Sequence, residues 1–191
     1  MEDKEGYNHI IELILSGNQQ AYSQLYDKTI HYVYKNVYFL IDDKADVDDL
    51  VQDIYIQVFK SLGKFDFERQ FKPWLMGIVI TQIKGYRRKR WMSTRIIKKA
   101  EENKKDYELD FSNQIIEKIT NQELVNLVNE LPYKLKQVII LRYLNDYSQE
   151  EVAQIIRIPI GTVKSRINSA LTKLRKKNNN VSFFIEGGKC I

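Results

Sequence analysis

The sequence has little cysteine, histidine, proline or glycine, and each shortage excludes a class of structure or site. Cys190 is the only cysteine among 191 residues, which excludes an internal disulfide framework and every cysteine-based zinc site. The two histidines and the acidic residues show neither metal-ligand spacing nor a nucleophile-base pair. We therefore predict no metal, no cofactor and no enzymatic activity, and a recombinase with a DNA-binding appendage is the weakest interpretation.

Long apolar runs are also missing. No stretch approaches the roughly 18 apolar residues that a membrane-spanning helix needs. The N-terminal segment MEDKEGYNHI is acidic and polar, whereas a signal peptide begins basic and continues apolar. With 43% hydrophobic and 29% charged residues, the chain has a globular composition. We predict a cytoplasmic protein of one or two domains.

Charge is distributed unevenly along the chain. Residues 42–53 hold six aspartates and one lysine, whereas residues 84–99 hold eight Lys or Arg and no acid. Residues 131–177 hold ten Lys or Arg and three acids. Because neutralisation of phosphates dominates nucleic-acid affinity, two separate basic blocks predict a polyanion bound at two places. The acidic block would repel that polyanion, so we expect it to face elsewhere.

The spacing of apolar residues predicts an all-α fold. With only three prolines and eight glycines, spacings of three and four recur and no strict alternation appears. We predict two helical domains, residues 1–92 and 114–178, joined by a flexible linker at residues 93–113 and followed by a tail at residues 179–191. Helices are expected at about 8–15, 19–39, 46–62, 73–91, 115–129 and 132–144. Asp46 is the expected N-cap of the third helix.

The C-terminal domain carries the pattern of a helix-turn-helix. Ser148 and Glu151 have the spacing of a capping box, and Pro159 is expected to end that short helix because it restricts the residue before it. From Gly161 a longer helix follows, with Ile160, Val163, Ile167, Ala170, Leu171 and Leu174 on its apolar side. Its other side is polar. An ordinary helical hairpin with a solvated outer face is the alternative.

The polar side of the second helix supplies the candidate DNA contacts. In a helix-turn-helix the first turns of this helix enter the major groove, where Arg166 is suited to bidentate pairing with guanine. Lys173 is better suited to a phosphate contact. The candidate contacts of this helix are Gly161, Thr162, Lys164, Ser165, Arg166, Ser169 and Lys173.

Two N-terminal helices carry further patterns. In ADVDDLVQDIYIQVF, residues 45–59, the side chains of Asp49, Gln52 and Asp53 share one face. Acids in a first turn also favour the helix dipole, which is the simpler interpretation of the pattern alone, and the spacing does not fit a calcium loop.

FKPWLMGIVITQIKGYRRKRW, residues 71–91, ends in basic residues interleaved with aromatic ones. Cations that hold phosphates and rings that stack on bases suit a melted DNA strand. Tyr86 and Trp91 are the stacking candidates, whereas Trp74 is expected in the core.

These patterns together resemble a known family. YSQEEVAQIIRIPIGTVKSRINSALTKLRK, residues 147–176, closely resembles the promoter-reading region of bacterial sigma factors of the extracytoplasmic function (ECF) group. The D-L-V-Q-D run at residues 49–53 is similar to their helix that docks on the clamp of the RNA polymerase β′ subunit. Residues 71–91 are similar to their segment that opens the −10 element.

The resemblance implies a transcription initiation factor without chemistry of its own. It would bind core RNA polymerase through Asp49, Leu50, Val51, Gln52 and Asp53, and read a −35 element with the C-terminal helix. It would recognise and melt the −10 element with Gln82, Lys84, Tyr86, Arg87, Arg88, Arg90 and Trp91. Contact with the polymerase β flap and an anti-sigma factor, membrane-bound or not, are implied as well. A stand-alone DNA-binding regulator would be expected to lack the clamp helix.

One departure from the family pattern concerns the −10 segment. Val79, Thr81 and Gly85 stand where alanine, asparagine and aspartate or asparagine are usual in the family. In the family the last of these positions helps to hold a flipped base, and glycine has no side chain to do so. We expect either that Gln82 or Lys84 takes over this role or that −10 specificity differs.

Overall fold

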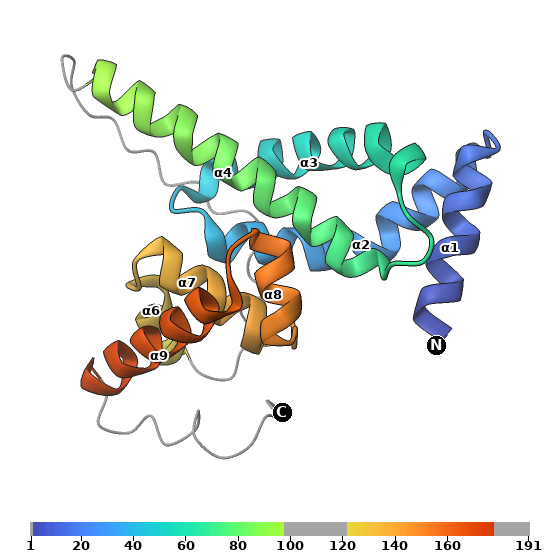
Figure 1. Cartoon of the computed structure of the whole chain (residues 1–191). Coiled ribbons are helices and arrows are strands. Elements are labelled where there is room, and N and C mark those ends of the chain that lie inside the picture. Colours follow the sequence, from blue (N-terminus) through green and yellow to red (C-terminus); the bar gives the residue numbers. More distant parts are fainter. Residues whose placement is uncertain (1, 98–121, 178–191) are drawn as a thin grey trace. The chain divides into compact units, whose positions relative to one another are not determined.

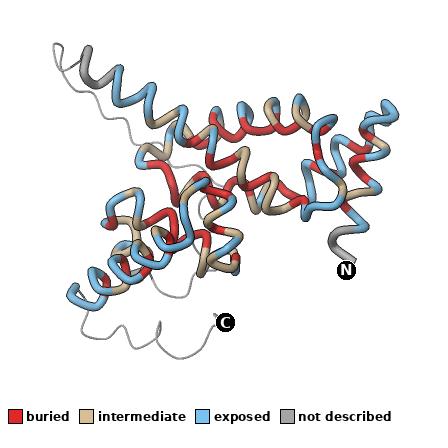
Figure 2. The backbone as a smooth tube through the Cα atoms, viewed as in Figure 1, coloured by how far each residue is buried: buried red, intermediate tan, exposed pale blue. Residues whose placement is uncertain are grey.

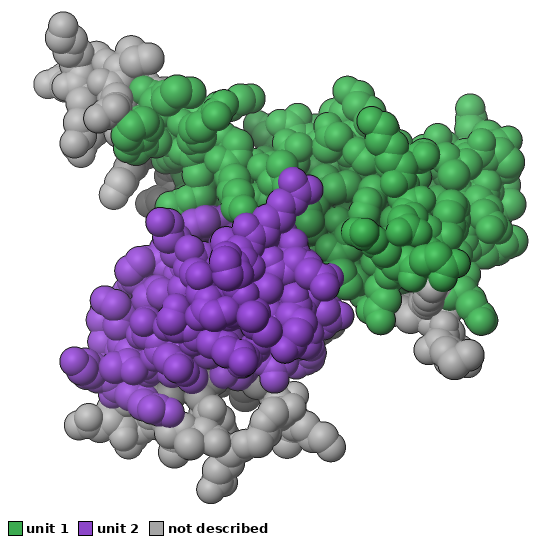
Figure 3. Space-filling view, viewed as in Figure 1, with its two compact units in different colours: residues 1–107 green, residues 108–191 purple. Residues whose placement is uncertain are grey.

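A computed structural model describes residues 2–97 and 122–177, and all regular structure in these residues is helical. The chain forms two compact units, residues 1–107 and 108–191 (Figure 3), which are described separately below. This agrees with the predicted all-α fold. Among the described residues, no helix has the length and hydropathy to cross a membrane.

The N-terminal unit consists of helices joined by short connections (Figure 1). Its elements are α1 (Glu2–Leu15), α2 (Gln19–Leu40), the 3-10 turn η1 (Lys44–Asp46), α3 (Val47–Ser61), the 3-10 turn η2 (Leu62–Lys64) and α4 (Phe71–Ile97). The helix α4 is longer than predicted and includes residues 93–97, which the sequence assigned to the linker. The remainder of the predicted linker, residues 98–113, and the tail lie outside the described residues.

The core of this unit lies where α2, α3 and α4 meet, and Figure 2 shows the buried positions along their facing sides. Four side chains of these helices are fully buried and anchor their packing: Leu25, Ile54, Leu75 and Ile83. The spacing of apolar residues in α2 predicts Tyr22 and Tyr26 on its inner side together with Leu25, but they are 37% and 40% exposed.

Ala21 and Thr29 of α2 are buried instead. The Thr29 hydroxyl lies 2.8 Å from the Tyr55 hydroxyl of α3 and donates a hydrogen bond to the Leu25 carbonyl at 2.6 Å. A threonine is therefore accepted in the interior because its polar atom is satisfied there. An apolar stripe drawn from spacing alone omits such a position.

The C-terminal unit packs short helices around a longer one. Its described elements are α6 (Gln122–Asn129), α7 (Tyr133–Ile139), the π-helical turn η3 (Ile140–Leu144), α8 (Gln149–Ile156) and α9 (Ile160–Lys177). The residues Leu131, Ile139, Ala170 and Leu174 form its core cluster. The predicted helix at 115–129 falls within the described residues only from residue 122 onward.

The helix-turn-helix has the predicted N-terminal cap and a different turn. The Glu151 amide donates to the Ser148 side chain at 3.1 Å, and the Ser148 amide donates to the Glu151 carboxylate at 2.8 Å, which confirms the capping box. The C-cap of α8 is Arg157, whose φ of 56° is left-handed, and the Ile158 amide donates to the Ala153 carbonyl at 3.1 Å. The left-handed conformation of Arg157 therefore ends the helix, before the restriction that Pro159 imposes on Ile158 takes effect.

Candidate protein-binding and nucleic-acid-binding surfaces

The predicted polymerase-binding residues divide between the surface and the core of the N-terminal unit. Asp49, Gln52 and Asp53 are exposed on one face of α3. Leu50 and Val51 are 5% and 4% exposed, so they mainly hold α3 against the core. A partner that docks on α3 would meet the three polar side chains directly.

Asp46 occupies the predicted N-cap position of α3, but its side chain makes no capping hydrogen bond there. The preceding Asp43 instead accepts a hydrogen bond from the Ala45 amide at 3.2 Å and caps η1. The Asp46 carboxylate turns toward α4 and accepts hydrogen bonds from the Tyr86 hydroxyl at 2.6 Å and from Arg90 at 2.8 Å. In the 3-10 turn that precedes α3, the Val47 amide donates to the Lys44 carbonyl.

Arginines of α4 pair with the same acidic segment. Arg87 lies 2.7 Å from Asp42, and Arg90 lies 2.7 Å from Asp43. The expectation that the acidic block faces away from the basic one is therefore wrong for Asp42, Asp43 and Asp46. The reason is topological: α3 packs against α4, so the turn before α3 lies beside the C-terminal half of α4.

The ion pair between Arg90 and Asp43 shifts the pKa of both groups. The hydrogen bond from Arg90 holds the pKa of Asp43 below its ordinary value of 3.8, and the same bond raises the pKa of Arg90. Burial raises the pKa of Tyr86 most, the hydrogen bond to Asp46 raises it further, and the result is a pKa of about 12. At neutral pH Asp43 and Arg90 are therefore charged, and Tyr86 keeps its proton as a donor.

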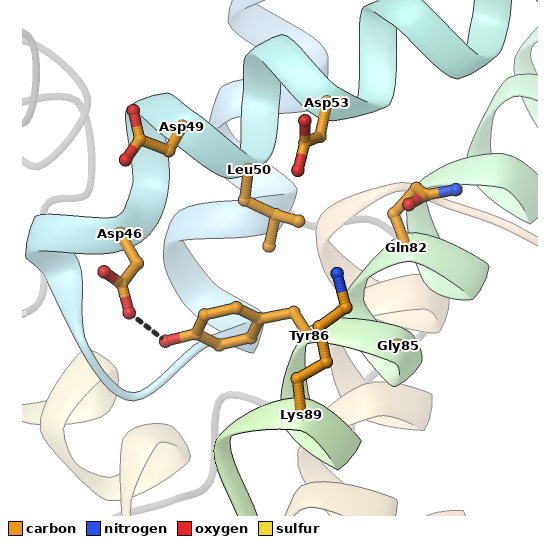
Figure 4. A pocket seen from close by; sticks show the side chains of 8 residues that line it. All are labelled: Asp46, Asp49, Leu50, Asp53, Gln82, Gly85, Tyr86 and Lys89. Atoms are coloured by element: carbon orange, nitrogen blue, oxygen red, sulfur yellow. Dashed lines mark hydrogen bonds between the residues drawn. The ribbon is translucent and has the colours of Figure 1, made fainter. Parts of the chain in front are cut away.

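A hollow of about 270 Å³ lies between α3 and α4 (Figure 4). It combines residues of both predicted N-terminal sites, and the Tyr86 hydroxyl points across it to Asp46. The lining residues are Asp46, Asp49, Leu50, Asp53, Gln82, Gly85, Tyr86 and Lys89. A Cβ atom at Gly85 would meet no atom within 4 Å, so the missing side chain leaves this wall of the hollow open.

The solvent side of α4 differs from the side that faces Asp42, Asp43 and Asp46. Lys84 and Arg88 are exposed there, and Trp91 is 58% exposed, whereas Lys89 is exposed at the edge of the hollow. Trp74, by contrast, contacts the rings of Phe65 and Phe71 with centroids 5.1 and 5.5 Å apart, but it is only half-buried and lies at the edge of the core in which it was expected. Lys89 was missing from the predicted site, although it lies within the basic block of the sequence.

The helix α9 separates apolar and polar residues as its periodicity predicts, with one exception. Val163, Ile167, Ala170 and Leu174 are buried, whereas Ile160, predicted on the apolar side, is 36% exposed because it is the first residue of the helix. Thr162 and Arg166 are half-buried, and the other candidate DNA contacts are exposed, namely Gly161, Lys164, Ser165, Ser169 and Lys173.

The cations of this surface differ from the arginines of α4. Lys164, Arg166 and Lys173 form no ion pair with any described residue. The described residues also contain no group of histidines, cysteines or acids placed to hold a metal ion.

Comparisons with known proteins match both units. Residues 25–92 match the family described as Sigma-70 region 2, and residues 121–174 match Sigma-70, region 4. The chain is 30% identical over 182 residues to the ECF RNA polymerase sigma-E factor of Escherichia coli (strain K12), covering 88% of this chain and 92% of that protein. It is 26% identical over 188 residues to the ECF RNA polymerase sigma factor SigW of Bacillus subtilis (strain 168), covering 87% and 94%.

Solved structures share the fold. The structure of CnrH in complex with the cytosolic domain of CnrY matches with a TM-score of 0.64 and 22% identity, covering 94% of this chain and 99% of that one. The sigma factor RpoE in complex with the anti-sigma factor NepR, from Bartonella quintana, matches with a TM-score of 0.66 and 22% identity, covering 81% and 94%.

Proposed function

The chain belongs to the ECF-type sigma-70 family of RNA polymerase sigma factors, which direct promoter-specific transcription initiation without enzymatic activity, and from this premise we propose how its residues divide that task. The proposal is carried by one observation. The polar residues of α3, α4 and α9 form three chemically distinct surfaces: acidic on α3, basic and aromatic on α4, and polar with scattered cations on α9.

The surface of α3 is proposed to bind core RNA polymerase. Asp49, Gln52 and Asp53 are exposed along two turns of a helix whose other side is anchored in the core by Leu50 and Val51. A rigid helix carrying carboxylates fits a basic protein surface and is unsuited to DNA, whose phosphates would repel it. This surface therefore selects a protein partner.

The C-terminal half of α4 is proposed to hold the melted −10 strand. Lys84, Arg88 and Lys89 supply phosphate contacts, and the exposed ring of Trp91 offers a stacking surface for a base. Tyr86 has a different part because its hydroxyl is bound to Asp46. Its ring lines the hollow together with Gln82 and the open wall at Gly85. We expect an unstacked base to bind and be recognised in this hollow.

The N-terminal half of α9 is proposed to read the −35 element. Arg166 is half-buried beside Thr162, so the protein restricts its position more than that of a fully exposed cation. It is the best candidate for a guanine contact. Lys173, two turns further along and exposed, is assigned to the phosphate backbone.

The remaining partners and the location follow as proposals. We propose that the chain acts in the cytoplasm, with core RNA polymerase. An anti-sigma factor, membrane-bound or not, is a further proposed partner. It is supported by the likeness in fold to RpoE, which was solved in complex with the anti-sigma factor NepR.

The division of labour can be tested with Asp49→Lys. Reversing a charge in the centre of the α3 surface should weaken binding to purified core RNA polymerase about tenfold or more, measured by fluorescence anisotropy. Binding of the full chain to duplex DNA should not weaken, because the duplex contacts are assigned to α9 and Asp49 belongs to α3. Asp27→Lys is the matched control, since Asp27 is an exposed carboxylate of α2. Equal loss of both activities in Asp49→Lys would contradict the assignment.

A further inference from the structure

The acidic turn, defined here as Asp42, Asp43 and Asp46, neutralises part of the basic block of α4. Arg87 pairs with Asp42, and Arg90 pairs with both Asp43 and Asp46. Two of the arginines that the sequence offers to a DNA strand are therefore bound to carboxylates of the same chain. The positive charge that the basic block offers to DNA is therefore lower than its composition indicates.

The turn is fixed in place by bonds of its own. The Lys44 ammonium donates hydrogen bonds to the carbonyls of Tyr38 and Ile41, the latter at 2.9 Å, and lies 4.3 Å from the centre of the Tyr38 ring. Asp43 also accepts a hydrogen bond from the Ala45 amide. The carboxylates are thereby held toward α4 before any ligand arrives. Their pairing with the arginines therefore carries little further cost in conformational entropy.

The contacts at Arg90 resemble those that a phosphate would make. One terminal nitrogen lies 2.7 Å from the Asp43 carboxylate and the other lies 2.8 Å from the Asp46 carboxylate. A guanidinium offers this fork of donors equally to carboxylates and to phosphates. The two kinds of acceptor are therefore alternatives for the same donors.

The pairs are also accessible to a competitor. The side chains of Arg87 and Arg90 are 32% and 47% exposed, and that of Asp42 is 68% exposed. Ion pairs with this exposure are weak and are screened by salt. A DNA phosphate that approaches α4 can replace a carboxylate, but the net gain is smaller than that from an unpaired arginine.

Resting on the strand-binding role proposed above for α4, we propose that the acidic turn is a built-in competitor for the DNA backbone. It withholds Arg87 and Arg90 from strands bound only by charge and so lowers affinity for single-stranded DNA of any sequence. Strand capture then depends on Arg88, Lys89 and the base contacts near Tyr86. Asp42, Asp43 and Asp46 act as positioning residues that set the balance between non-specific and promoter-directed binding.

The test is the salt dependence of single-stranded DNA binding by the full chain. A fluorescent oligothymidine, which offers backbone without promoter sequence, is titrated by anisotropy between about 50 mM and about 300 mM KCl. Each arginine released to the strand should steepen the slope of log K against log salt by about 0.7. Extrapolated from 1 M salt, that change corresponds to about eightfold tighter binding at about 50 mM.

Two independent variants and a matched control decide the result. Asp43→Asn with Asp46→Asn releases Arg90, and Asp42→Asn releases Arg87 while keeping the Tyr86–Asp46 hydrogen bond. Each should tighten binding and steepen the slope. Asp27→Asn removes one charge from an exposed position of α2 and should leave the slope unchanged. Should the double variant lose its helical circular dichroism, Asp42→Asn alone decides.

Other outcomes overturn the proposal or separate it from its premise. An unchanged slope in the acidic-turn variants, or an equal increase in Asp27→Asn, would show that the turn does not compete. Weaker binding would show that the turn prepares the arginines for DNA instead. Arg88→Gln tests the premise: it should flatten the slope by about 0.7, and no change there would refute strand binding by α4 whatever the acidic turn does.

Discussion

The α3–α4 region and the exposed side of α9 both carry polar residues of the proposed sites, yet they hold them in opposite ways. In the α3–α4 region, Tyr86, Arg87 and Arg90 are bound to carboxylates 40 to 47 residues away in the sequence. On α9, the Ser165 hydroxyl donates a hydrogen bond to the Thr162 carbonyl one turn away, at 3.0 Å. The first surface is organised by the tertiary structure and the second by the helix itself.

This difference separates two modes of nucleic-acid binding. A helix in the major groove needs side chains that reach outward, and its backbone supplies the rigidity. A surface that captures a flexible strand has no such template, so its side chains must be arranged in advance by their neighbours. The hydrogen bond of Asp46 with Tyr86 provides that arrangement, whereas the ion pair of Asp46 with Arg90 is proposed to hold this arginine back from the strand.

The largest effect is expected where α9 reads DNA. Arg166→Ala should reduce discrimination between the cognate −35 sequence and one with its guanine replaced by about 1–3 kcal/mol, measured by competition binding. Lys173→Ala should weaken both sequences equally and reduce the salt slope by about 1. If Lys173 rather than Arg166 changes the discrimination, the assignment of base and backbone contacts along α9 is reversed.

A smaller effect is expected at the cap that begins the helix-turn-helix. Ser148→Ala removes the acceptor for the Glu151 amide and should lower the free energy of unfolding of the C-terminal unit by about 1 kcal/mol, followed by urea denaturation. Thr172→Ala, at an exposed position of α9, is the control and should not destabilise. Equal stability of Ser148→Ala and the wild type would mean that packing alone holds α8.

The smallest effect is expected at Gly85, inside α4. A methyl group there meets no atom within 4 Å, and alanine is a better helix former than glycine. Gly85→Ala should therefore raise the free energy of unfolding by about 0.5–1 kcal/mol. A loss of stability would show that the wall of the hollow is more crowded than its geometry indicates.

The features that the sequence predicted correctly are those that local physics determines. The Ser148–Glu151 capping box joins residues three apart, and the buried side of α9 follows from its periodicity at Val163, Ile167 and Leu174. The exposed acidic face of α3 follows in the same way. In each case the residues that decide the outcome lie within one or two helical turns, so a linear pattern contains them.

The features that the sequence did not predict depend on distant contacts. No periodicity shows that Arg90 meets Asp43, or that Tyr86 meets Asp46, because the partners come together only when α4 packs on α3. The opposite charges of the two blocks are a signal for this pairing, whereas repulsion between the acidic block and a bound polyanion predicts surfaces that face apart. The burial of Thr29 likewise required the Tyr55 hydroxyl of another helix.

Run-off transcription tests the division between α4 and α9 most directly. Core RNA polymerase with the wild-type chain, Arg88→Gln or Arg166→Ala is assayed on one promoter, either fully duplex or with its −10 segment already opened by mismatches. Strand contacts offset the cost of opening base pairs, so pre-opening should recover much of the Arg88→Gln deficit and little of the Arg166→Ala deficit. Equal recovery of both variants, or recovery of Arg166→Ala alone, would contradict the account.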